Sequence, residues 1–211
     1  MNNLYYKLAI ASVCTTLSFV LGANKEAKAA IFSLPSTINS EIVDGSIESF
    51  DGLGDEIFVE IAYMAVAKGT FGEAAQVTEF NIGSFSFGTN KAISNAVLQV
   101  QIYSLGLYGL GINTPTNPGR LGIFGYVGNG TGETSDFEAG VFLNSVDISS
   151  SSDNDILNFN VTPFVNQQVN NGDAFAGFGI RALNFGGLFL SNGGYSGSKP
   201  RLTGLTQARY M

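Results

Sequence analysis

The sequence contains no histidine and no tryptophan, and its single cysteine is Cys14. Without histidine, Ser-His-Asp and Cys-His catalysis are excluded. The usual zinc sites are excluded as well, because they are built from histidine and cysteine. Neither a phosphate-binding glycine loop nor a dinucleotide fingerprint occurs. The chemistry left to the chain is that of carboxylates, amides, hydroxyls and aromatic rings.

Charged residues are scarce, at 13% of the chain, whereas glycine and aromatic residues are abundant. The 27 Gly, 17 Phe and 8 Tyr residues are typical of strands connected by glycine-rich turns. The net charge of −7 favours solubility and disfavours binding to nucleic acid, which is itself polyanionic. We therefore expect no nucleic-acid partner.

The first 29 residues have the pattern of a secretory signal peptide. A short start with one positive charge precedes an uncharged apolar run, Leu8 to Leu21, and the small-x-small sequence Ala27-Lys28-Ala29 follows. The run of about 14 residues is short for a membrane span, which needs about 20. We expect cleavage after residues 1–29, and one secreted domain at residues 30–211 with no membrane span. Cleavage removes Cys14, three lysines and one glutamate, which changes the net charge from −7 to −9 and leaves no disulfide.

The clearest local pattern is a strand, a short helix and a second strand between Asp155 and Ala182. In the first strand, apolar and polar residues alternate up to Val161, the period of a half-buried strand. Thr162 offers a hydroxyl cap, Pro163 suits the first helical position, and Asn171-Gly172 ends the helix. One face of the second strand carries Ala176, Phe178, Ile180 and Ala182, and the other carries Phe175, Gly177, Gly179 and Arg181.

Short strand-like segments recur along the rest of the chain. After an extended lead-in at 32–40, they lie at 41–47, 57–66, 77–82, 95–105, 120–127, 141–148 and 200–205, with a glycine-broken aromatic stretch at 185–195. In 95–105, Ala96, Leu98, Val100 and Ile102 alternate with Val97, Gln99, Gln101 and Tyr103. Many short strands separated by turns predict an all-β fold, namely a single jelly-roll β-sandwich of about nine or ten antiparallel strands with one short helix.

Five short motifs follow one another along the mature chain. They are Phe80-Asn81-Ile82, the segment Ile93 to Val100 with Ala96 and Leu98, Phe159-Asn160-Val161-Thr162, Gly177-Phe178-Gly179-Ile180, and Lys199-Pro200-Arg201-Leu202. In this order they resemble the strands of DNRLRE-type modules, although Asn81 and Asn160 stand where that family usually has Asp. The resemblance implies a non-catalytic, secreted β-sandwich of a kind often attached to polysaccharide-active or cell-surface proteins. Some members bind carbohydrate and some hold a structural calcium ion.

Carbohydrate binding needs an aromatic platform with polar partners beside it. The candidate sugar-binding residues, chosen because they share strand faces, are Gln99, Gln101, Tyr103, Arg120, Tyr126, Phe175 and Arg181. Between Phe175 and Arg181 the outer face of the strand carries only glycine. Two interpretations of this gap stay open: a trough for a sugar, or room for the preceding helix or a neighbouring ring.

Calcium prefers six to eight oxygen ligands. Asp153 and Asp155 lie in a short acidic turn, and Asp44 is one of several acids near the start of the domain. These three aspartates are the candidate calcium ligands, with an ordinary polar loop as the alternative.

The sequence therefore predicts a secreted, non-catalytic module, extracellular or on the cell surface, that binds extracellular polysaccharide. The alternative is a structural or adhesive surface protein that packs against copies of itself or another surface protein. A third possibility is a glycosidase or lyase, which needs only two carboxylates about 5–10 Å apart. Its candidates are Glu60, Glu79, Glu133 and Glu138, although the alternation predicts an outward, solvated Glu79.

Overall fold

The fold was analysed in a computed structural model of the chain. It describes residues 30–45, 54, 56–59, 61–83, 91–107, 110, 112–193 and 197–208. The predicted signal peptide lies outside these residues. Within them the chain forms twelve strands and one short α-helix, and every strand pairing is antiparallel. The prediction of an all-β fold with a single short helix is confirmed.

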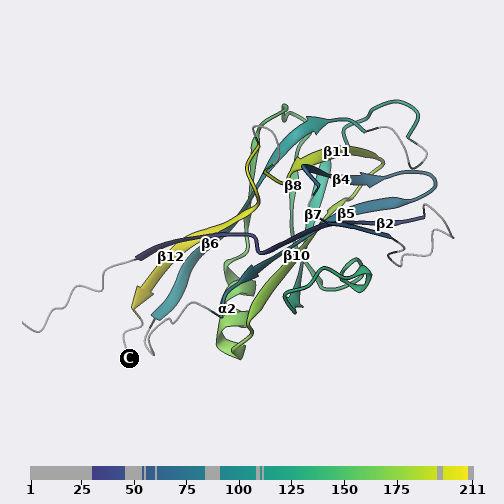
Figure 1. Cartoon of the computed structure of the whole chain (residues 1–211). Helices are drawn as coiled ribbons and strands as arrows, with labels where there is room; N and C mark the ends of the chain where they lie inside the picture. Colours follow the sequence, from purple (N-terminus) through teal and green to yellow (C-terminus); the bar gives the residue numbers. More distant parts are fainter. Residues whose placement is uncertain are drawn as a thin grey trace, which may run out of the picture.

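The twelve strands form one strongly curled sheet, a half-barrel, and β6 (Lys91–Leu105) connects its two parts. The residues of β6 from Lys91 to Gln99 pair with β12 (Arg201–Ala208), which in turn pairs with β1 (Ala30–Pro35). Further along, Ile102 to Leu105 pair with β11 (Gly186–Ser191). In Figure 1, β1, β6 and β12 extend to one side of the molecule.

The remaining strands complete the sheet in the order β11-β4-β5-β10-β7-β8, and in Figure 1 β4 and β5 extend to the other side. Their bounds are β4 Tyr63–Lys68, β5 Glu73–Asn81, β10 Phe175–Ala182, β7 Arg120–Gly128 and β8 Val141–Asp147. Strand β2 (Ile38–Asp44) pairs with β5, and β3 (Glu56–Val59) pairs with β2. Among the described strands, β9 (Ile156–Asn160) pairs only with β6, and β8 pairs only with β7. Strands β8 and β9 therefore end the curled sheet without pairing to each other.

The main hydrophobic core lies inside the curl. It takes alternate residues of β6 and β10, as the period-two pattern predicts. The fully or almost fully buried members from these two strands are Ala96, Leu98, Val100, Ile102, Ala176, Phe178, Ile180 and Ala182. Phe178 is at the centre, with edge-to-face contacts to Phe80 at 5.9 Å and to Phe164 at 5.4 Å.

The helix α2 (Thr162–Asn171) covers one end of this core, close to β6 and β10. Phe164 and Val165 are buried, and Gly172 ends the helix in the left-handed conformation with φ 80°, which glycine adopts without strain. The start differs from the expectation, because the N-cap residue is Val161 and the side-chain oxygen of Asn160 accepts a hydrogen bond from the N–H of Thr162 at 3.1 Å. The Thr162 hydroxyl instead accepts a hydrogen bond from the Ala96 N–H at 2.9 Å, which ties the helix to β6.

Two segments of the predicted strand pattern are wrong. The lead-in 32–40 belongs to two strands, β1 and β2, and the apolar run 57–66 is divided between β3 and β4. The run is not one buried strand, since β3 pairs with β2 while β4 pairs with β11, and Phe58 and Val59 are 41% and 58% exposed. These divisions explain why the number of strands, twelve, is larger than the predicted nine or ten.

A short 3₁₀ helix, η1 (Thr134–Asp136), lies in the segment between β7 and β8. This segment covers the outer side of β2 and β5: Phe137 is buried there against Ile42, Ala75 and Val77. In the described part of the chain, no helix is long and apolar enough to cross a membrane.

We expect Phe178→Ala to lower the free energy of unfolding by about 3–5 kcal/mol, the usual cost of truncating a fully buried phenylalanine. The physical cause is a cavity between the rings of Phe80 and Phe164. Urea denaturation monitored by circular dichroism measures the change. Val127→Ala, at a residue that is 60% exposed, is the control and should stay within about 0.5 kcal/mol of the parent protein. Equal effects of both substitutions would contradict this placement of the core.

Candidate functional site

The outer side of β6 carries a row of polar side chains that ends in an aromatic pair. Gln99, Gln101 and Tyr103 alternate with the buried core residues and are partly exposed. Gln99 stands opposite Arg201 of β12 on one side and Asn158 of β9 on the other. We call Gln99, Gln101, Tyr103, Asn158 and Arg201 the amide face.

Hydrogen bonds hold the amide groups of this face in position. The Gln99 amide donates to the Asn158 side-chain oxygen at 2.9 Å. The side-chain oxygen of Gln101 accepts from the backbone N–H of Ser198 at 2.8 Å and from its hydroxyl at 3.0 Å. Such bonds reduce the freedom that a ligand would otherwise have to restrict on binding.

The aromatic end of the amide face contains a residue that the sequence pattern did not single out. Tyr103 stacks on Tyr63 of β4, with ring centroids 5.0 Å apart and planes 6° from parallel. Phe189 of β11 meets Tyr63 edge-on, also at 5.0 Å. Tyr63 is 37% exposed. The two tyrosines are forty residues apart in the sequence, and β11 lies between their strands, so no local periodicity relates them.

A small pocket of about 140 Å³ opens beside Gln99. It lies where β12 ends its pairing with β6 at Gln99 and β11 begins at Ile102. Its lining residues come from β6, β9, the start of β12 and the residues just before it: Gln99, Val100, Ile156, Ser198, Lys199 and Arg201. Lys199 and Arg201 form no ion pair within the described residues, and Arg201 donates to the Ser33 hydroxyl at 3.2 Å.

The other predicted sugar-binding residues lie in a different part of the curled sheet, on β7 and β10. Arg120 is exposed at the start of β7 and donates to the Ser145 hydroxyl at 2.7 Å. Tyr126 of β7 stands opposite Gly177 of β10, whereas Phe175 and Arg181 lie near the two ends of β10. The structure therefore does not bring these four residues to Gln99, Gln101 and Tyr103.

A neighbouring ring fills the space above Gly177 of β10, whereas a Cβ atom on Gly179 would meet only Phe124 at 3.9 Å. A Cβ atom on Gly177 would lie within 2.4 Å of the Tyr126 ring, so only glycine admits that ring. The Arg181 guanidinium lies 4.8 Å from the centre of the Phe124 ring and 4.7 Å from that of Phe137, distances that allow cation–π attraction. Of the two interpretations of the gap, room for a neighbouring ring matches the geometry at Gly177.

Glu79 lies on the outer side of β5, but its predicted exposure to solvent is wrong. It is fully buried under the segment that follows β7, and its carboxylate accepts hydrogen bonds from the N–H groups of Gly130 at 2.7 Å and Asn129 at 3.4 Å. Burial raises the pKa of Glu79, the Gly130 N–H lowers it, and the nearby charge of Asp136 raises it again. Tyr126 and Asp136 are buried beside it, and burial raises both of their pKa values.

The other glycosidase candidates do not join Glu79 in an open cleft. Glu133 is exposed and accepts hydrogen bonds from the Asn129 amide at 3.2 Å and the Thr131 hydroxyl at 3.0 Å. Glu138 is exposed as well. Glu60 lies outside the described residues.

The three candidate calcium ligands do not come together. Asp153 accepts a hydrogen bond from the Leu105 N–H at 2.7 Å, and Asp155 accepts one from the Ser152 N–H at 2.8 Å. Asp44 is buried at the end of β2, opposite Glu73. Within the described ranges, no group of three or more potential ligands can hold a metal ion.

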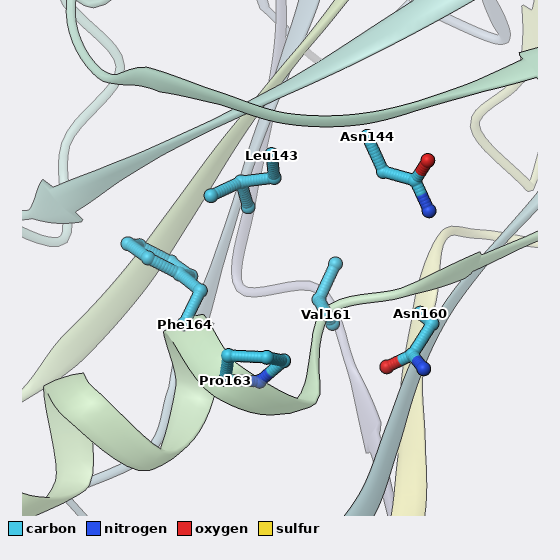
Figure 2. Close-up of a pocket in the computed structure, with 6 residues that line it drawn as sticks. All are labelled: Leu143, Asn144, Asn160, Val161, Pro163 and Phe164. Atoms are coloured by element: carbon cyan, nitrogen blue, oxygen red, sulfur yellow. The ribbon is translucent and has the colours of Figure 1, made fainter.

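A second pocket, of about 200 Å³, lies at the start of α2, between strands β8 and β9, which do not pair with each other. Leu143 and Asn144 of β8 face Asn160 of β9 and the residues Val161, Pro163 and Phe164 that follow it. Figure 2 shows the two asparagines on one side of the pocket and Leu143, Pro163 and Phe164 on the other. We call it the seam pocket. The sequence pattern placed Asn160 and Val161 in a strand motif but predicted no pocket there.

Comparison with known proteins adds no relative: no family model matches the chain, and no curated protein is significantly similar to it. The resemblance to DNRLRE-type modules stays a prediction.

The buried Glu79 predicts a specific pH dependence of stability. Its pKa is raised in the folded protein, so folding favours the protonated form, and this contribution decreases as the pH rises from 4.5 towards neutrality. Glu79→Gln keeps an oxygen for the Gly130 N–H and removes the charge. The variant should melt at a higher temperature than the parent at pH 7, with a smaller difference at pH 4.5.

Thermal melting across this pH range measures the effect. Glu133→Gln is the control, because Glu133 is exposed and nearby, and it should follow the parent curve. The prediction would be contradicted if the difference in melting temperature between the parent and Glu79→Gln were the same at pH 4.5 and at pH 7.

Proposed function

We propose that the chain is a secreted, non-catalytic module that binds extracellular polysaccharide through the amide face. The observation that carries the proposal is the row formed by Gln99, Gln101 and Tyr103 on the outer side of β6, with Tyr63 stacked on Tyr103. Amides supply both donors and acceptors for sugar hydroxyls, and an aromatic ring packs against the C–H face of a sugar. The row follows one strand, which suits an extended polymer.

The finer fold belongs to the same proposal. We infer that the curled sheet is a jelly-roll β-sandwich, with β6 passing from one sheet to the other. The change of neighbour along β6, from β12 to β11, supports this. The resemblance to DNRLRE-type modules supports it independently, and so does the secretory pattern of residues 1–29.

The positions of the carboxylates support a binding role over a hydrolytic one. Glu79 is buried under the segment after β7, where it accepts hydrogen bonds from backbone N–H groups, and Asp136 is buried within that segment. A glycosidase needs its acid and its base or nucleophile on either side of the scissile bond, which these two side chains do not offer to a polymer.

A second candidate is a structural or adhesive surface protein. It is favoured by the exposed apolar residues of β3 and the segment leading into β4, since Phe58, Val59, Ile61 and Tyr63 are between 37% and 58% exposed. Strand β3 pairs with β2 alone among the described strands, so its other edge offers backbone groups to a second copy. In this case the polysaccharide is replaced by a protein partner.

Affinity electrophoresis of the purified secreted protein in gels containing neutral or acidic polysaccharides tests the first proposal. At least one polymer should retard the parent protein, and Tyr103→Ala should weaken its binding by about tenfold or more, since truncating a central aromatic contact costs on the order of 1–2 kcal/mol. Phe71→Ala is the matched control. It truncates an aromatic residue that is 68% exposed in the turn between β4 and β5. Absence of retardation across a broad panel contradicts the proposal.

Light scattering over a hundredfold dilution tests the adhesive alternative. If copies associate through β3, the mass at high concentration should exceed that of one chain, and Val59→Lys should restore the monomer by placing a charge on the exposed edge strand. Ile31→Lys, at a residue that is 83% exposed on β1, controls for added charge. A monomer at every concentration excludes this alternative.

A further inference from the structure

The seam pocket has a fixed apolar wall. Val161 and Phe164 are members of the main core, and Leu143 packs against it. The Phe164 ring contacts Phe178 at 5.4 Å, and a Cβ atom on Gly125 would lie within 2.9 Å of it. The ring is therefore packed closely against β7 and β10. This wall therefore exists before any ligand binds, which lowers the cost of binding.

The opposite wall offers hydrogen-bond donors. The side-chain oxygen of Asn144 accepts from the Ser145 N–H at 2.7 Å. That of Asn160 accepts from the Thr162 N–H at 3.1 Å and from its hydroxyl at 2.7 Å. A backbone N–H can only donate, so the atom facing it is the amide oxygen. In the described part of the chain, neither asparagine nitrogen donates a hydrogen bond to protein, and both amide groups lie on the same side of the pocket in Figure 2.

These two walls select a particular chemistry. The oxygens of both asparagine amides are already engaged, so the groups left on this wall are the NH₂ donors. Such donors are best satisfied by a group that only accepts, such as a carbonyl, whereas a sugar hydroxyl both donates and accepts. A methyl group beside that carbonyl fits the wall formed by Leu143, Pro163 and Phe164. All six lining residues are uncharged, so a carboxylate or phosphate would lose its solvation without a cationic partner. The volume of about 200 Å³ is below the roughly 300–1,000 Å³ of common small-molecule sites and limits the ligand to about one ring.

We propose that the seam pocket binds the acetyl group of a neutral, acetylated sugar residue, with its carbonyl between Asn144 and Asn160 and its methyl against Leu143 and Phe164. The acetyl group comes either from an N-acetylated sugar or from an O-acetylated polysaccharide. The pocket lies at the free edge of β9, away from Tyr103, so this site does not rest on the amide face. Binding to one place can fail while the other persists.

Nuclear magnetic resonance titration of the ¹⁵N-labelled secreted protein tests the proposal with three probes: N-acetylglucosamine, O-acetylated glucose and glucose. We expect the side-chain NH₂ signals of Asn144 and Asn160 to shift with one or both acetylated sugars, with a Kd on the order of 1 mM for a single residue. Glucose should bind at least about tenfold more weakly. Which acetylated sugar binds more tightly identifies the source of the group.

Asn144→Asp and Asn160→Asp, made singly, keep the internally bonded oxygens and remove the donors. Each should weaken binding of the acetylated sugar by about tenfold or more while the melting temperature stays near that of the parent. Asn113→Asp adds the same charge on an exposed loop residue and should leave the Kd unchanged. Equal shifts with glucose overturn the assignment to acetyl groups, and no shift at Asn144 or Asn160 overturns the site. Because the mapping uses the parent protein, the result does not depend on the variants folding.

Discussion

The hydrogen-bonded pairing of β6 with its neighbours holds the two parts of the curled sheet together. Over its fifteen residues, one edge of the strand pairs first with β12 and then with β11, while β9 pairs along Val97 to Gln101. From Ala96 to Ile102 every second residue is buried in the core, and on the other side of the strand Gln99, Gln101 and Tyr103 belong to the amide face. The same strand therefore determines the core on one side and the proposed polysaccharide surface on the other.

The outer side of β10, unlike that of β6, is covered by residues that pack against it. Glycine at position 177 admits the Tyr126 ring, and the segment after β7 places Phe137 over Arg181. Burying Glu79 costs free energy, because a carboxylate loses hydration that the N–H groups of Gly130 and Asn129 only partly replace. Although aromatic rings and an arginine gather on this face, they are used for packing, and the open polar surface lies on β6.

Local patterns predicted the elements whose environment is simple. The alternation in β6 and β10 identified their buried residues, and Asn171-Gly172 located the end of α2, because periodicity and a left-handed glycine act over a few residues. The prediction of one strand at 57–66 was wrong because the run is almost continuously apolar. Its division into β3 and β4 follows only from their different pairing strands, β2 and β11. Glu79 was expected in solvent because alternation identifies a face without saying what covers it.

The sequence by itself determined the class of fold, the helix and the face on which each residue of β6 and β10 lies. Only the tertiary structure decided which of these faces is open and which residues from distant strands meet there. Tyr63 stacks on Tyr103, and Asn144 of β8 and Asn160 of β9 lie on the same side of the seam pocket. The physical reason is that alternation depends on the geometry of one strand, whereas contact between strands depends on register, curl and the packing of the whole core.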